Sequence, residues 1–250
     1  MSYLFIVCHP RSRSTALAAV LGSHPGIAGQ SEQRRHYNRE ANLAEMRRQA
    51  AEQYDPPKTG ADWFLDKIPL QLRIAQEIHR RDDTRFIFIA RRPEAALASM
   101  LLMSGGFRRR LRTAADCARL YRQRLRTMID LFDSIDPTRR IFIDGDRLAR
   151  DPETHLSAIT DLLGLSPPLR NAYRIARSGG IIGDPNLLRR RRQGAIGTTE
   201  RPEIPVFVDT ESLTLWREAE FRIGACGVLK KRPGAESRPP WKDGYCIEIS

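Results

Sequence analysis

Lysine is scarce in this sequence. Only five of the 42 lysine and arginine residues are lysine, so nearly all of the basic charge is carried by arginine. Arginine forms bidentate pairs with phosphate, sulfate and carboxylate groups. The formal net charge is +12, and we therefore expect an anionic partner: a nucleotide, a nucleic acid or an acidic membrane. Solvated helix faces account for many of the arginines as well.

Cysteine is also scarce, and its positions exclude one class of site. Cys8, Cys117, Cys226 and Cys246 form no C-x-x-C pair and no cluster with histidine. This spacing argues against a structural zinc site, and we predict no metal. Nothing in it requires a disulfide. Aromatic residues make up 7% of the chain, which predicts a mostly aliphatic core.

Long apolar runs are missing. No run approaches the length that crosses a membrane. The opening M-S-Y-L-F-I-V-C is too short for the core of a signal peptide and lacks a basic start. We therefore expect a cytoplasmic protein that does not insert into a membrane.

Short apolar runs alternate with amphipathic segments. The pattern predicts strands over 3–8, 63–65, 85–90 and 140–143, and helices over 14–21, 38–53, 70–80, 94–103, 114–132 and 152–163. This alternation is typical of an α/β fold with a central parallel sheet flanked by helices, in one domain over 1–250. Such sheets bind ligands at the carboxyl ends of their strands. We also predict a mobile basic loop over 178–200 and a loose tail over 230–250.

The loop after the first strand carries the strongest functional signal. It reads H-P-R-S-R-S-T over residues 9–15 and leads into a helix that we expect Ser12 or Ser14 to cap. Backbone N–H groups at a helix start favour an anion, and the arginines and hydroxyls add to this. The loop lacks the glycines and lysine of the kinase pattern GxxxxGK[ST], which weakens a kinase interpretation. An ordinary capped turn is the alternative.

A second strand runs directly into a helix at residues 85–99, R-F-I-F-I-A-R-R-P-E-A-A-L-A-S. Pro93 suits the first turn of that helix. Arg91 at the strand end and Ser99 about two turns into the helix could together hold one anion. The alternative is a basic loop beside a surface serine.

Four motifs, in order along the chain, resemble those of sulfotransferases that use 3'-phosphoadenosine 5'-phosphosulfate (PAPS). P-R-S-R-S-T is similar to the family's 5'-phosphosulfate loop, and I-A-R-R-P-E-A-A-L-A-S to its 3'-phosphate segment. The stretch 142–165 resembles Y-E-D-L-x-x-D-P-x-x-x-L, and R-R-Q-G-A-I-G resembles R-K-G-x-x-G. The resemblance implies a P-loop-like sulfotransferase fold of the bacterial or Golgi type.

The resemblance also implies donor-binding roles. Arg11 matches the catalytic cation that touches the sulfuryl group. The other implied PAPS ligands are Ser12, Ser14 and Thr15 for the 5' side, and Arg91, Ser99, Arg192 and Gly194 for the 3'-phosphate. Arg13 departs from the pattern, because the family has glycine there. That position suits a tight turn, or Arg13 adds a phosphate contact of its own.

On the acceptor side the resemblance points to a carboxylate base. The segment D-K-I-P has no histidine, unlike the cytosolic branch, whereas H-P-G-I-A-G-Q-S-E places Glu32 on the second glutamate of the family's H-P-x-x-x-x-G-E-E. Ser31 replaces the first glutamate, and His36 is the reserve candidate for the base. Lys67 resembles the lysine that lines the acceptor pocket. A solvated loop carboxylate and a surface lysine are the alternatives for Glu32 and Lys67.

We therefore predict a sulfotransferase that moves a sulfuryl group from PAPS, without a metal, to a hydroxyl of a small-molecule acceptor. The alternatives are a nucleotide-binding kinase, a non-catalytic nucleotide-binding protein and a basic nucleic-acid-binding protein. The arginines are not interleaved with aromatic residues, which argues against a nucleic-acid partner.

Overall fold

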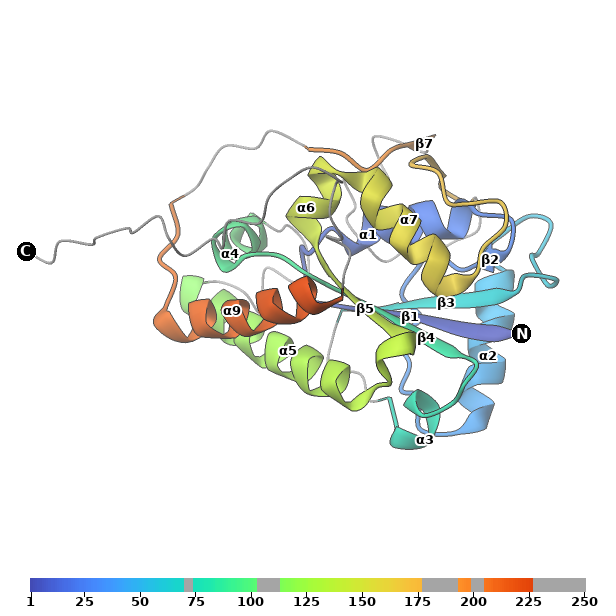
Figure 1. Ribbon diagram of the computed structural model, residues 1–250, viewed down its shortest axis with the longest axis horizontal. Helices are drawn as coiled ribbons and strands as arrows, with labels where there is room; N and C mark the ends of the chain where they lie inside the picture. Colours follow the sequence, from blue (N-terminus) through green and yellow to red (C-terminus); the bar gives the residue numbers. More distant parts are fainter. Residues whose placement is uncertain (70–73, 103–112, 177–192, 199–204, 227–250) are drawn as a thin grey trace, which may run out of the picture.

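A computed structural model describes residues 1–69, 74–102, 113–176, 193–198 and 205–226 (Figure 1). Its strands are β1 (Ser2–Cys8), β2 (Ile27–Ala28), β3 (Trp63–Ile68), β4 (Thr84–Ala90), β5 (Arg140–Asp144), β6 (Tyr173–Arg174) and β7 (Gln193–Gly194). Its α-helices are α1 (Ser14–Ser23), α2 (Glu40–Ala51), α3 (Gln76–His79), α4 (Pro93–Leu101), α5 (Ala114–Ser134), α6 (Gly145–Arg150), α7 (Pro152–Leu163) and α9 (Thr210–Ala225), and η2 (Pro137–Arg139) is a 3-10 turn.

The central sheet is parallel throughout and has the strand order β2-β3-β1-β4-β5. Strand β1 lies in the middle and is buried on both faces, which explains its unbroken apolar run. In the register, Val7 is level with Ile68 of β3, and Cys8 with Ile89 of β4. The carboxyl ends of these three strands therefore meet at one edge, and the segments that follow them start side by side. The predicted fold class is confirmed.

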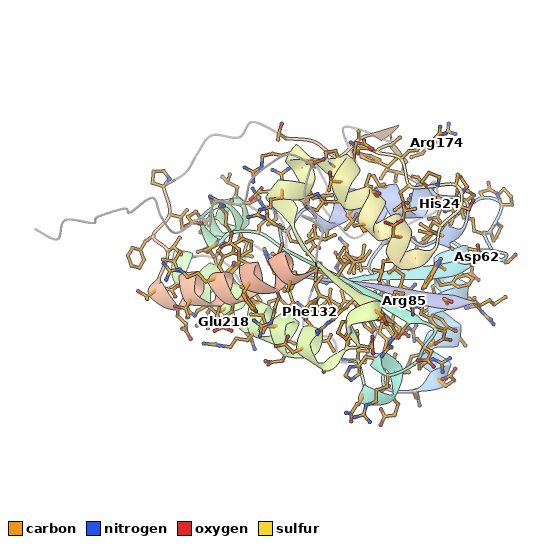
Figure 2. All side chains as sticks on the ribbon, viewed as in Figure 1. His24, Asp62, Arg85, Phe132, Arg174 and Glu218 are labelled. Carbon is orange, nitrogen blue, oxygen red and sulfur yellow. The ribbon has the colours of Figure 1, made fainter. Side chains whose placement is uncertain are left out.

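Helices cover both faces of the sheet. α1, α6 and α7 pack on one face, and α2, α4, α5 and α9 on the other (Figure 1). The core between the sheet and α1, α6 and α7 is mostly aliphatic, as predicted. The core on the side of α2, α4, α5 and α9 also contains a group of phenylalanines. There Phe132 of α5, which is labelled in Figure 2, packs against Phe88 and Phe142 of the sheet, with ring centroids 5.3 and 5.4 Å apart. Aromatic residues are nevertheless a minority of this second cluster, so the core is mostly aliphatic on both faces, as predicted.

Local signals explain several helix boundaries. Thr113 and Asp116 form a reciprocal capping box at the start of α5. Pro93 occupies the first turn of α4, where its missing N–H costs nothing. Gly164 ends α7 in the left-handed conformation, at φ 59°. The last two boundaries follow the sequence prediction.

Three predictions about the elements were wrong. The helix expected over 70–80 is limited to α3 in the described residues, because Ile74 and Ala75 pair with Tyr37 as extended backbone. Strand β3 continues to Ile68, since its polar residues 66 and 67 are buried and paired inside the protein. The prediction also missed α6 and α9. Most of the loop predicted over 178–200, and all of the tail over 230–250, lie outside the described residues.

Helix α6 begins against the loop that follows β1. A Cβ atom on Gly145 would lie 2.3 Å from the backbone carbonyl oxygen of Ser12, closer than real Cβ contacts. The absence of a side chain at residue 145 thus allows the end of β5 and the loop after β1 to touch.

We expect Gly145→Ala to lower the free energy of unfolding by about 1–3 kcal/mol, because the backbone must move to admit the methyl group. Urea denaturation measures this. Gly224→Ala in α9 is the matched control, since nothing lies within 4 Å of its added Cβ, and helix propensity should raise its stability by up to about 1 kcal/mol. Wild-type stability in Gly145→Ala would show that the close approach is not required.

Candidate functional site

The loop between β1 and α1 has unusual backbone geometry. Arg11 and Arg13 both adopt positive φ angles, 69° and 73°. The left-handed conformation costs a non-glycine residue about 1–2 kcal/mol. The tight turn expected at residue 13 is therefore present, although the residue is arginine. Arg13 is also the N-cap of α1, and no side chain among the described residues caps this helix. The prediction of a Ser12 or Ser14 cap was wrong, because the left-handed turn takes the N-cap position.

The same loop leaves polar groups without protein partners. Ser12 is fully buried, and its Oγ has no hydrogen-bond partner among the described residues. The first N–H groups of an α-helix have no acceptor within the helix and carry partial positive charge. A buried hydroxyl and an uncapped helix start therefore lie together, in surroundings suited to a bound anion. Ser14, at the first position of α1, is buried in the same place.

Three arginines lie in or beside this loop, and their contacts join it to the helices that follow β4 and β5. Arg11 Nε donates to Ser99 Oγ of α4 at 2.9 Å. Arg91 Nε and Arg13 Nε both reach Asp146 Oδ1, at 2.8 and 3.2 Å. The sequence predicted that Arg91 and Ser99 hold one anion together. In the structure Ser99 contacts Arg11, and one carboxylate oxygen of Asp146 binds the guanidinium groups of Arg13 and Arg91. Arg13 also donates through Nη1 to Gly197 O at 3.2 Å.

Lys67 connects the start of α1 to Glu32, the candidate base. Its Nζ donates to Thr15 Oγ1 at 3.0 Å and forms an ion pair with Glu32 Oε1 at 2.9 Å. The two side chains of the pair are only 2% and 10% exposed. Only the Lys67 ammonium group thus separates Glu32 from Thr15 of α1. Glu32 is not a solvated loop carboxylate, and Lys67 is not a surface lysine.

The segment that carries Glu32 is fastened to β3 by Asp66. Its Oδ1 accepts from the Gln33 backbone N–H at 2.9 Å, and its Oδ2 accepts from the Tyr37 hydroxyl at 2.6 Å. Asp66 is fully buried, and burial raises its pKa to about 7 despite these hydrogen bonds. Asp66 points to the opposite face of β3 from Lys67, so adjacent residues hold the two sides of the segment.

The remaining predicted residues are less involved in these contacts. The side chain of His36 is exposed. Gly194 lies in β7, where a Cβ would come within 2.9 Å of the Tyr173 hydroxyl. Arg192 lies outside the described residues.

Sequence reasoning missed several residues of the site. Asp146 follows the end of β5, and a polar residue at a strand end is a usable signal. Asp66 gave a weaker signal, a charge inside an apolar run. Beneath the loops lie three more buried polar residues, His9, Tyr121 and Arg124. The signal for Arg124 was a charge on the otherwise apolar face of α5.

Comparisons with known proteins agree with this architecture. A model described as "Sulfotransferase family" matches residues 36–168, more than half of the chain. That match includes Lys67, Arg91 and Ser99 and begins after Glu32. No curated protein matches the chain.

Two solved structures share the fold. The sulfotransferase domain from the Synechococcus PCC 7002 olefin synthase aligns with a TM-score of 0.57 and 20% identity, over 88% of this chain and 94% of that one. The sulfotransferase domain from the curacin biosynthetic pathway aligns with a TM-score of 0.55 and 16% identity, over 88% and 97%.

Among the described residues, no group of three or more His, Cys, Asp or Glu side chains could hold a metal ion. No helix in this part of the chain is long and apolar enough to span a membrane.

We expect Asp66→Asn to change how stability depends on pH. Because burial raises the pKa of Asp66 from 3.8 to about 7, the folded state keeps a proton that the unfolded state loses. Wild-type stability should therefore fall as pH rises through this window. Asn carries no proton to lose, so urea titrations of Asp66→Asn should show a shallower decline. Asp82→Asn, at an exposed side chain, should keep the wild-type slope. An unchanged slope in Asp66→Asn would contradict the assignment.

Proposed function

The chain belongs to the sulfotransferase family, and we propose that it moves a sulfuryl group from PAPS to a hydroxyl of a small-molecule acceptor. The observation that carries this proposal is the contact of Lys67 with both Thr15 and Glu32. It joins a helix start suited to an anionic donor to a partly buried carboxylate suited to an acceptor proton.

The donor proposal rests on the anion-binding features of two loops. The 5'-phosphosulfate would lie on the start of α1, where the N–H groups, Ser12 Oγ and Thr15 Oγ1 offer hydrogen bonds. Arg11 would face the sulfuryl oxygens. The 3'-phosphate would be held by Arg91 and Ser99, with Arg192 and Gly194 closing over it. Arg13 lies close enough to Asp146 to share in this cluster.

In the proposed step, the acceptor oxygen forms a bond to sulfur while the bond from sulfur to the bridging phosphate oxygen breaks. Glu32 takes the acceptor proton, and 3'-phosphoadenosine 5'-phosphate (PAP) leaves with the electron pair of the broken bond. Arg11 and the loop N–H groups would stabilise charge on the sulfuryl oxygens and on the leaving phosphate. A base on one side and a cation on the other suit an in-line displacement.

Lys67 would serve both halves of the site. It neutralises the Glu32 carboxylate in the resting protein. Through Thr15 it fixes the distance between that carboxylate and residues 9–15, which we call the donor loop. We place the reaction in the cytoplasm, as the sequence predicts, and expect neither a metal nor a nucleic acid to take part.

PAP should raise the melting temperature more than AMP does, because a ligand that binds only the folded state stabilises it by mass action. AMP lacks the 3'-phosphate that Arg91 and Ser99 would hold. Thermal-shift titrations with PAP, AMP and ATP measure the difference, and ATP tests the kinase alternative. Equal shifts with PAP and AMP would remove the 3'-phosphate assignment, and a larger shift with ATP would favour a kinase.

Glu32→Gln should lower turnover by roughly a hundredfold or more while nucleotide binding survives, because the amide keeps the shape but cannot take a proton. The assay uses radiolabelled PAPS with a hydroxyl acceptor identified by screening. Glu153→Gln, at an exposed side chain of α7, is the control and should turn over normally. Normal turnover in Glu32→Gln would rule out Glu32 as the base and make His36 the next candidate.

A further inference from the structure

Beneath the site, one face of α5 carries two buried polar side chains. Tyr121 and Arg124 lie three residues apart and therefore on the same face of the helix. Their exposed fractions are 0% and 1%. Arg124 is a buried cation that no carboxylate contacts in the part of the chain that the structure describes, and burial lowers its pKa to about 10. Burying such a group costs several kcal/mol, whereas an apolar side chain would fill the same volume without that cost.

Arg124 binds the ends of two adjacent strands. Its Nε donates to the carbonyl of Cys8, the last residue of β1, at 2.7 Å. Its Nη2 donates to the carbonyl of Ile68, the last residue of β3, at 2.6 Å. The donor loop begins immediately after Cys8, and Lys67 immediately precedes Ile68. One guanidinium group therefore sets the distance between these two parts of the site.

Tyr121 and His9 bind both backbone groups of Arg91. The Tyr121 hydroxyl donates to Arg91 O at 2.9 Å, and the Arg91 N–H donates to His9 Nε2 at 2.9 Å. His9 Nδ1 donates to Pro10 O at 2.8 Å, and the rings of His9 and Tyr121 meet edge to face with centroids 5.0 Å apart. Burial lowers the pKa of His9 to about 4, so the ring is neutral and its proton lies on Nδ1.

We propose that His9, Tyr121 and Arg124 are positioning residues that hold the donor loop, Arg91 and the end of β3 in one fixed arrangement. This inference rests on the proposed function, because it assigns to Arg91 the 3'-phosphate and to the donor loop the 5'-phosphate. It predicts separable effects. If Arg91 is held less firmly, only the contact with the 3'-phosphate should weaken. If the end of β1 is held less firmly, the affinity for every nucleotide with a 5'-phosphate should fall.

Tyr121→Phe should weaken PAP binding about tenfold while AMP binding stays near the wild-type value, because one buried hydrogen bond is lost and the ring stays in place. Arg124→Lys keeps the charge but loses the fork that spans two strands, and should weaken PAP and AMP by similar factors. Calorimetric titrations with the two nucleotides measure these effects.

Tyr54→Phe is the matched control. The Tyr54 hydroxyl also donates to a backbone carbonyl at 2.9 Å, that of Gly22, and it accepts from the Gly29 N–H at 3.1 Å, away from Arg91. This variant should lose at least as much stability as Tyr121→Phe but bind both nucleotides as the wild type does. Wild-type PAP affinity in Tyr121→Phe, or an equal loss in Tyr54→Phe, would overturn the proposal.

Amide hydrogen exchange tests the same residues without a nucleotide. The Arg91 amide should exchange faster in Tyr121→Phe than in Tyr54→Phe, because its backbone is held less firmly. If wild-type protein does not distinguish PAP from AMP, the donor assignment fails, and the exchange of Arg91 still decides the proposal. Unchanged exchange in Tyr121→Phe would overturn it.

Discussion

The parallel pairing of β1 with β3 and β4 determines where the loop after β1, Lys67 and Arg91 lie. Because the register brings Val7 level with Ile68 and Cys8 level with Ile89, three strands end at one edge of the sheet. The loop after β1, Lys67 and Arg91 are each only one or two residues from those ends. Residues far apart in the sequence thus meet without long loops, and small changes at a strand end reach the whole site.

Strand–loop–helix units were the most predictable part of the structure. The apolar run of β1, the proline of α4 and the glycine after α7 each act through neighbours in the sequence, so a pattern reveals them. Helix α9 was missed although Asp209 caps it and its buried residues recur at helical spacing. The extended pairing of Ile74 was beyond local reasoning, because its partner, Tyr37, is distant in the sequence.

The sequence predicted which residues belong to the candidate site better than it predicted which side chains those residues contact. The resemblance predicted Glu32 as a candidate base, and the structure adds the ammonium group that lies between Glu32 and Thr15. Asp146 contacts arginines that follow β1 and β4, and Arg124 contacts the last carbonyls of β1 and β3. These partners are distant in the sequence, so no periodicity specifies the contacts. The common signal of Asp146 and Arg124 was a charge where an apolar residue fits the pattern, at a strand end or on a buried helix face. Interior charges of this kind identify a site more reliably than surface arginines do.

The carboxylate of Asp146, shared by Arg13 and Arg91, has a consequence for how the protein meets anions. A guanidinium group that is already paired attracts a distant anion less than an unpaired one, since the carboxylate offsets part of its field. Two guanidinium groups on one carboxylate still keep a net positive charge, so an arriving anion both adds to this balance and competes with Asp146 for the same donors. Selectivity at this cluster therefore depends on how well a ligand competes with a carboxylate at close range, and the large positive charge of the chain contributes mainly to the speed of encounter.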